Sequence, residues 1–176
     1  MRILGIDPGL QLTGYGVIDH KPHVRTPALI DAGVIRLKAK TSVSQRLVEL
    51  ERELESILDE HAPQVVCVEQ LYAHYAHPRT AIIMGHARGV ILLAAARREL
   101  RLVELAANRI KQSVTGHGHA GKSQIQRAVQ GIWNLAAPPE PPDVADALAI
   151  AYACCLKLQT PDAPPSASFA HARKRG

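Results

Sequence analysis

Aromatic residues are scarce in this chain, whose 176 residues include one Phe, one Trp and four Tyr. The core is therefore predicted to consist of Ala, Val, Leu and Ile, and the chain is long enough to bury most of its apolar surface in one domain. Long apolar runs are also absent, because the longest, GVILLAAA from Gly89, is followed by two arginines. That run is too short to span a bilayer, so we expect neither a transmembrane helix nor a membrane partner.

Cysteine is rare as well. The three cysteines, Cys67, Cys154 and Cys155, have the spacing of neither a disulfide framework nor a zinc site. Buried, reduced thiols are the expected state, which is typical of a cytoplasmic protein. The first residues, MRILGIDPG, lack the apolar segment of a signal peptide and instead predict a short strand. We therefore expect a cytoplasmic location.

Acidic residues are unevenly distributed in a chain of net charge +5. Six of them lie within residues 49–60, whereas residues 70–98 and 105–139 contain none. The acid-free stretches carry these basic residues: Arg79, Arg88, Arg97, Arg98, Arg109, Lys111, Lys122 and Arg127. Such segregation favours one basic surface that binds a polyanion such as DNA, although a run of like charges is also an ordinary solvated surface.

The apolar pattern predicts an α/β fold. Residues 3–6, 13–19 and 28–37 are short strands separated only by loops, so they should form an antiparallel meander. The later elements are a helix at 42–60, a strand at 64–70, a helix at 78–98, a strand at 100–105 and helices at 108–115, 122–133 and 143–157. Strands reached through a helix should pair in parallel. We expect a five-stranded mixed sheet whose first three strands are antiparallel, with helices on both faces.

The first and fourth strands should be neighbours near the centre of this sheet. We assign residues 1–158 to one domain. Residues 159–176, which are rich in Pro, Ala and basic residues, are predicted to form a disordered basic C-terminal tail.

Two carboxylates stand at the ends of the two strands that should be neighbours. Asp7 and Glu69 would lie about 4.8 Å apart at the carboxyl edge of the sheet, where sites form in α/β proteins. Asp143 and Asp146 share one face of the first turn of the last helix, which can pack back to the same edge. Four carboxylates together need divalent metal to relieve their repulsion, and all-oxygen ligation favours Mg²⁺ or Mn²⁺ over zinc. Two such ions about 3.5–4 Å apart suit phosphodiester hydrolysis.

Each acid also has an ordinary structural interpretation. Asp7 before Pro-Gly is a common turn residue, and Glu69 at a strand end can pair with an arginine. Asp143 and Asp146 can serve as a helix cap and a second acid that complements the helix dipole. The combination is more informative than any member, because three separate segments place acids where the topology would bring them together.

The loop GHGHAGKS, residues 116–123, formally matches the phosphate-binding motif G-x-x-x-x-G-K-S. That motif requires a buried strand before it, whereas the preceding residues have helical spacing, so we expect no nucleotide cofactor. A flexible loop that presents backbone amides and Lys122 to a DNA phosphate is the preferred interpretation. His117 and His119 could chelate a metal, but a solvated loop or a phosphate contact is favoured.

Five motifs in this order resemble the RuvC family of bacterial Holliday junction resolvases. They are GIDPGLQLTGYGVI, VEQLYA, ARGV, IKQSVTGHGHAGKSQIQ and DVADALAIA, and the resemblance covers residues 1–158. It implies a ribonuclease H-like fold and a homodimer that cuts four-way DNA junctions by paired symmetric nicks in homologous recombination and DNA repair. It also implies two Mg²⁺ ions per subunit, with Mn²⁺ as a substitute, and a branch-migration motor complex as partner.

The resemblance assigns roles to individual residues. Asp7, Glu69, Asp143 and Asp146 match the catalytic, metal-binding acids, and the position of Asp143 is the one where relatives carry either Asp or His. Lys111 and Lys122 match basic residues that bind the DNA backbone, and Lys122 also serves catalysis. Tyr72 stands where the family has an aromatic residue near the junction centre. The DNA-binding candidates are Tyr72, Arg79, Lys111, His117, Lys122 and Arg127.

The helix at 78–98 is apolar around more of its circumference than packing on one side requires. Gly85 and Gly89 would allow another helix to approach closely, so this helix is either buried in the monomer or forms the dimer interface that the resemblance implies.

Two other functions remain open. GIDPG also resembles the phosphate loop of actin-like ATPases, which need two such domains. A non-catalytic DNA-binding scaffold is disfavoured, because unpaired acids weaken DNA binding.

Overall fold

The computed structural model describes residues 1–70 and 78–159, with the backbone alone for 78–80. It contains the strands β1 (Arg2–Asp7), β2 (Leu12–Asp19), β3 (Ala28–Arg36), β4 (Val65–Glu69) and β5 (Arg101–Leu105). It contains the helices α1 (Val43–His61), α2 (Pro78–Arg97), α3 (Ala107–Thr115), α4 (Lys122–Trp133) and α5 (Pro142–Gln159). Each element was predicted from the sequence to within two residues at either end.

The five strands form one mixed sheet in the order β3-β2-β1-β4-β5. β1 pairs antiparallel with β2, and β2 pairs antiparallel with β3. β4 runs parallel to both β1 and β5. The predicted meander and the predicted adjacency of the first and fourth strands are therefore confirmed.

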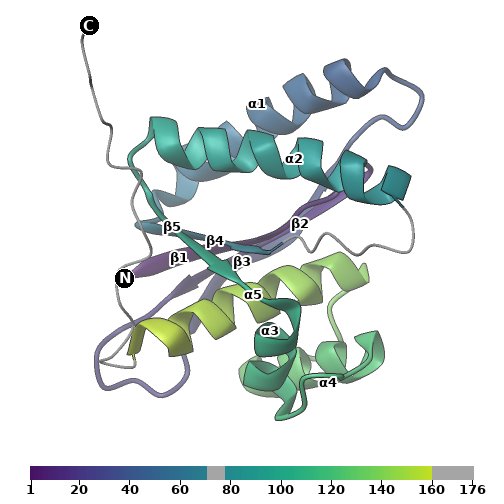
Figure 1. Ribbon diagram of the computed structural model, residues 1–176. Helices are drawn as coiled ribbons and strands as arrows, with labels where there is room; N and C mark the ends of the chain where they lie inside the picture. The colour runs from purple at the N-terminus through teal and green to yellow at the C-terminus, as the bar shows by residue number, and fades with distance from the viewer. Residues whose placement is uncertain (71–77, 160–176) are drawn as a thin grey trace, which may run out of the picture.

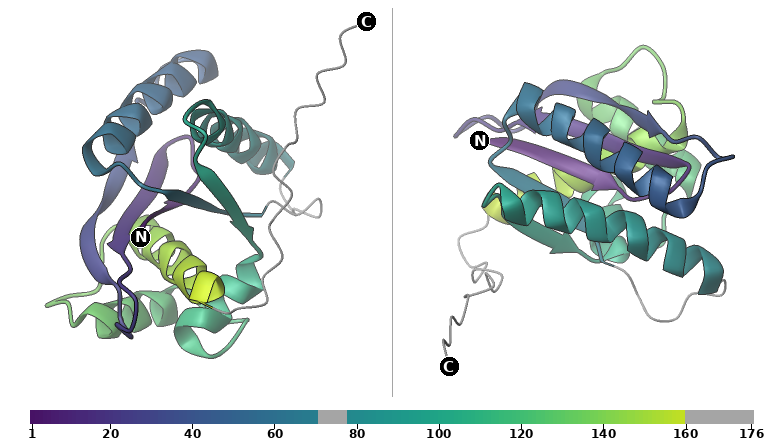
Figure 2. Two further views of the ribbon diagram at one scale, coloured as in Figure 1. Left: turned by 90° about the vertical axis from the view of Figure 1, so that its left-hand side faces the viewer. Right: turned by 90° about the horizontal axis from the view of Figure 1, so that it is seen from above.

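Helices cover both faces of the sheet, as predicted. α1 and α2 lie side by side on one face, and α3, α4 and α5 lie on the other (Figures 1 and 2). Side chains alternate between the faces along each strand: Leu4 and Val66 pack with the α1–α2 layer, whereas Ile3 and Cys67 pack with the α3–α5 layer. All three cysteines are free and buried, as expected from their spacing.

α5 packs directly against glycines of β1 and β2. A methyl group on Gly5 would lie 2.5 Å from the backbone nitrogen of Ala151, and one on Gly16 would lie 2.7 Å from a methyl carbon of Leu148. Such distances are well inside van der Waals contact, so the missing side chains allow the helix backbone to rest on the strand backbones. The helix carries small residues on its side of this contact, among them Ala147 and Ala151, both fully buried.

The arginines of α2 do not all contribute to a basic surface. Arg97 pairs with Glu51 of α1 at 2.7 Å, and Arg98, just beyond α2, contacts both Glu55 and Asp59. Arg88 pairs with Glu104 of β5. These three arginines therefore add little free positive charge to the basic surface predicted from the acid-free stretches, because the fold places acids from other segments beside them.

The C-terminal residues 160–176 lie outside the residues that the structure describes. α5 continues to Gln159, so the first residue assigned to the C-terminal tail is helical, and the rest of that predicted tail lies outside the described residues. In the described parts of the chain, no helix combines the length and the apolarity that crossing a membrane requires.

Replacement of Gly5 by alanine should destabilise the protein by about 2 kcal/mol or more, because α5 must move away from the sheet to admit the methyl group. The free energy of unfolding from urea titration measures this effect. Gly131→Ala in α4 is the matched control, since nothing lies within 4 Å of its added methyl group. This variant should gain about 0.5–1 kcal/mol from helix propensity. Equal stability of Gly5→Ala and wild type would contradict the close packing.

Candidate active site

Asp7 and Glu69 end two adjacent parallel strands. The register pairs Ile6 with Val68, so the two acids occupy the next position on β1 and β4 at the carboxyl edge of the sheet. Neighbouring strands lie about 4.8 Å apart. Tertiary structure therefore holds the two carboxylates together, as the sequence predicted.

The turn after Asp7 is fixed by a buried threonine. The hydroxyl of Thr13 donates to the carbonyl oxygen of Gly9 at 2.5 Å and accepts from the Gly9 N–H at 3.3 Å. Thr13 is completely buried, so these two bonds satisfy a hydroxyl that has no access to water. This closed turn fixes the direction in which the chain leaves Asp7.

α5 brings two further acids to the same place. The helix begins at Pro142, so Asp143 and Asp146 lie in its first turns. Gly14 of β2 pairs directly with Asp7 of β1, and a methyl group on Gly14 would collide with the Asp143 carbonyl group. The start of α5 thus lies over the strand position beside Asp7.

A cleft of about 860 Å³ contains all four of these acids. The sequence-predicted residues that line it are Asp7, Glu69, Lys111, Lys122, Asp143 and Asp146. They come from β1, β4, α3, α4 and α5, which are far apart in the sequence. Apolar side chains such as Ile83 and Ile150 complete the lining.

Burial, with repulsion among the carboxylates as a further cause, raises the pKa values of three of these acids. The pKa of Asp7 is raised from 3.8 to about 8, first by burial of its carboxyl group and then by the three other carboxylates of the cleft. The pKa values of Glu69 and Asp146 are also raised, again chiefly by burial. A carboxylic acid with these surroundings gives up its proton at neutral pH only if a cation compensates the charge.

Two lysines supply part of the opposing charge. Lys122 is the first residue of α4 and lowers the pKa of both Asp7 and Asp146. Lys111 of α3 acts in the same way on Glu69 and Asp146. The loop 116–123 that carries Lys122 follows the helix α3 and not a strand, as predicted, so it lacks the context of a nucleotide-binding loop.

The four acids fit a hard divalent cation by their chemistry. All of their donors are carboxylate oxygens. The raised pKa values of Asp7, Glu69 and Asp146 come first from burial and then from neighbouring carboxylates, so the site carries excess negative charge when these acids are ionised. Among the described residues, no three His, Cys, Asp or Glu side chains lie close enough together to hold an ion as they stand. Metal binding would therefore require the carboxylates to draw closer to one another.

Two of the other predicted DNA-binding residues, His117 and Arg127, do not line the cleft. His117 is exposed on the loop between α3 and α4, where its backbone N–H donates to the Thr115 hydroxyl at 3.1 Å. Arg127 is exposed on α4, and neither residue belongs to the cleft lining. Tyr72 and the side chain of Arg79 lie outside the described residues.

Sequence reasoning missed two arginines near the acids. Arg46 of α1 lines the cleft and donates from its Nη1 to the carbonyl oxygen of Leu10 at 3.0 Å. Arg88 of α2 donates from its Nε to the Glu69 carbonyl oxygen at 3.3 Å. Arg88 could have been suspected from the ARGV motif, but nothing in the sequence around Arg46, which precedes an acidic helical run, indicates a cleft.

Comparison with known proteins identifies the family. The family model described as crossover junction endodeoxyribonuclease RuvC matches residues 3–154. A protein of that description from Rhodopirellula baltica is 48% identical over 149 residues, covering 84% of this chain and 82% of the relative. One from a Synechococcus species is 43% identical over 155 residues, covering 86% and 96%.

A solved structure agrees with these relatives. The RuvC of T. thermophilus in complex with Holliday junction substrate matches with a TM-score of 0.82 at 30% identity, over 90% of this chain and 94% of that one. The predicted ribonuclease H-like fold is thereby confirmed. The chain belongs to the RuvC family of crossover junction endodeoxyribonucleases.

Proposed function

We propose that this chain is a structure-selective endonuclease that resolves four-way DNA junctions by paired symmetric nicks, in homologous recombination and DNA repair. Family membership supports this function, and the solved relative of similar fold carries a Holliday junction substrate. The observation that carries the proposal is the convergence of four carboxylates from three separate segments in one cleft.

Catalysis in this family depends on metal, and we assign two Mg²⁺ ions per subunit, with Mn²⁺ as a substitute. Asp7, whose carboxyl group interacts with those of the other three acids, would be the ligand common to both ions, and Glu69, Asp143 and Asp146 would complete the ligand set. When bound, the ions supply a Lewis acid for the attacking water and for the leaving oxygen. Asp143, nearest the start of α5, also complements the helix dipole.

The chain's own residues bind and orient the DNA strand. Lys122 and Lys111 already oppose the charge of the carboxylates, so their ammonium groups lie where a scissile phosphate would accumulate negative charge. Lys122 at the start of α4 has the catalytic role, and Lys111 binds the backbone. Tyr72, Arg79, His117 and Arg127 are further DNA-binding candidates, of which His117 and Arg127 lie outside the cleft lining.

A homodimer is supported by an uncovered apolar face of α2. Ile82 is 59% exposed and Leu93 is 48% exposed, and nothing lies within 4 Å of a methyl group placed on Gly89. These positions are separated by seven and four residues, so they share one helix face. Two sites related by a twofold axis match a substrate with twofold symmetry.

We also propose that the protein acts with a branch-migration motor complex and that it is located in the cytoplasm.

Purified protein with Mg²⁺ should cut a synthetic four-way junction into nicked duplexes by paired symmetric nicks. Asp7→Asn should lower the cleavage rate by about a thousandfold or more, because it removes a charged ligand from the centre of the site. Denaturing gels with labelled strands measure both. Glu99→Gln, at an exposed acid outside the cleft, should cut as wild type does. Equal cutting by Asp7→Asn would reject the proposed site.

The stability of the metal-free protein should depend on the Asp7 proton. Because the folded state raises the pKa of Asp7 from 3.8 to about 8, the folded state holds the proton more tightly than the unfolded chain does. The stability of wild type should therefore fall as pH rises from about 4 to about 8. Asp7→Asn cannot ionise, so it should exceed wild type by up to about 5 kcal/mol at pH 8 and by little at pH 4.

Urea unfolding in EDTA at a series of pH values measures this difference. Addition of Mg²⁺ at pH 8 should stabilise wild type more than Asp7→Asn, since only wild type retains the full ligand set. Parallel pH profiles for the two proteins would show that Asp7 is not in the repulsive environment described.

Leu93→Glu should convert the dimer into a monomer, because it places a charge in the apolar contact between two α2 helices. Val24→Glu is the matched control, since Val24 has a similar exposure of 46% and lies on the loop between β2 and β3. Sedimentation equilibrium gives the mass of each variant. A wild-type mass of one subunit at micromolar concentration, or a dimer in both variants, would exclude the α2 interface.

A further inference from the structure

Arg46 enters the active-site cleft from the helical layer opposite to the lysines. It belongs to α1, which covers one face of the sheet, whereas Lys111 and Lys122 belong to α3 and α4 on the other face (Figure 1). All three residues line the same cleft. The cleft therefore carries positive charge on two walls, with the four carboxylates between them.

The guanidinium group of Arg46 is anchored but not paired with an acid. Its Nη1 donates to the Leu10 carbonyl oxygen at 3.0 Å, and its Nε is shielded from solvent without a hydrogen-bond partner among the described residues. Three other arginines on or beside α2 in this layer, Arg88, Arg97 and Arg98, are each in an ion pair with a glutamate. Arg46 forms no such pair with a described acid, so its charge is uncompensated.

Arg46 also differs from the lysines in what its charge acts on. Lys122 and Lys111 lower the pKa values of the cleft carboxylates, but Arg46 contributes to none of these shifts. Its guanidinium lies in the same cleft, held beside the Leu10 carbonyl oxygen. Arg46 is thus a second cationic position in the cleft, and it forms no ion pair with an acid among the described residues.

We propose that Arg46 binds a backbone phosphate of the DNA strand, distinct from the phosphate that is cut, on the wall opposite Lys111 and Lys122. This inference rests on the proposed function. A guanidinium group presents a planar fork of donors that matches two oxygens of one phosphate. The bond to Leu10 fixes this fork beside the turn that follows Asp7, so a strand held by Arg46 is positioned relative to the catalytic acids.

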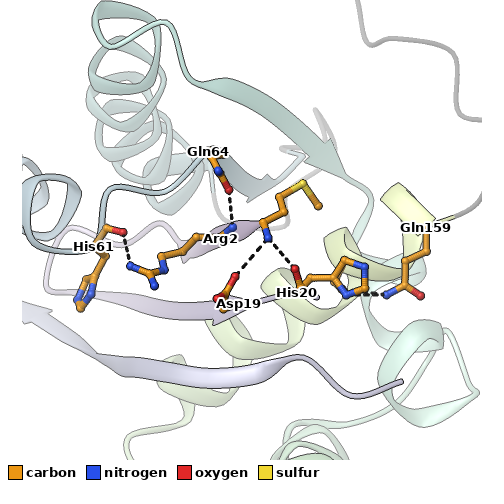
Figure 3. A network of polar contacts seen from close by, with 8 residues as sticks. Arg2, Asp19, His20, His61, Gln64 and Gln159 are labelled. Carbon is orange, nitrogen blue, oxygen red and sulfur yellow. Dashed lines mark hydrogen bonds and ion pairs between the residues drawn. The ribbon is translucent and has the colours of Figure 1, made fainter. Parts of the chain in front are cut away.

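Arg2 offers a matched control for the same local chemistry. Its Nη1 donates to the His61 carbonyl oxygen at 2.9 Å, and its Nε is likewise shielded without a partner (Figure 3). Arg2 begins β1, however, whereas Arg46 is bonded to the turn beyond the other end of that strand. Arg2 does not line the cleft. Loss of either arginine removes an equivalent anchor, but only Arg46 is expected to touch DNA.

The experiment measures equilibrium binding of a synthetic four-way junction in EDTA at several salt concentrations, for wild type, Arg46→Gln and Arg2→Gln. Each phosphate contact contributes about 0.9 to the slope of log K against log salt. Arg46→Gln should lower the magnitude of that slope by about 0.9 and weaken binding about tenfold. Arg2→Gln should retain the wild-type slope, and circular dichroism melting checks that both variants fold.

The outcomes separate the inference from the proposed function. A wild-type slope for folded Arg46→Gln, or equal loss in both variants, overturns the role of Arg46. If Arg46→Gln does not fold, Arg46→Met retains most of the aliphatic stem without the charge, and a wild-type slope for this variant overturns the inference. If wild type itself neither binds nor cuts the junction, the proposed function fails, whatever the variants do.

Discussion

The contact between α5 and the glycines of β1 and β2 determines where the acids of the cleft lie. Two of the acids are fixed by strand ends, and the other two are carried by the helix, so their separation depends on how closely the helix approaches the sheet. Gly5 and Gly14 allow this approach because any side chain there would collide with the backbone of α5. A conventional layer of Val or Leu at these positions would hold the helix several ångströms farther from the strands and separate the two pairs of carboxylates.

The same close approach creates the electrostatic character of the cleft. Bringing four carboxylates into a partly buried space raises the pKa of Asp7 to about 8 and raises those of Glu69 and Asp146 as well. The fold bears this cost in the absence of metal, and the two lysines from the α3–α4 side reduce it only in part. A site in this condition attracts divalent cations strongly, which is the chemistry that phosphodiester hydrolysis uses. The destabilisation of the free site and its affinity for cations therefore have one physical origin.

The sequence predicted most of the fold, because its strands are short, its helices are periodic and its acids follow strand ends. Asp7 and Glu69 could be placed together from topology alone. Side-chain contacts between elements that are far apart in the sequence could not be predicted. Arg97 and Arg98 lie in an acid-free stretch, yet the packing of α2 on α1 pairs them with acids from another helix. The sequence around Arg46 did not indicate that this residue lines the cleft. Its position there depends on its bond to Leu10, in a turn whose path is fixed by the buried Thr13.

The small side chains on the sheet-facing surface of α5 have a consequence for how the protein tolerates substitution. Ala147 and Ala151 are buried and do not line the cleft, but they set the height of the helix above the sheet and hence the reach of Asp143 and Asp146. Enlarging either one would lift the end of the helix that carries the acids while leaving the cleft surface chemically intact. The methyl groups of Ala147 and Ala151 therefore affect both the stability of the fold and the positions of the catalytic acids. Engineering this enzyme for thermostability by repacking its core would therefore change its chemistry.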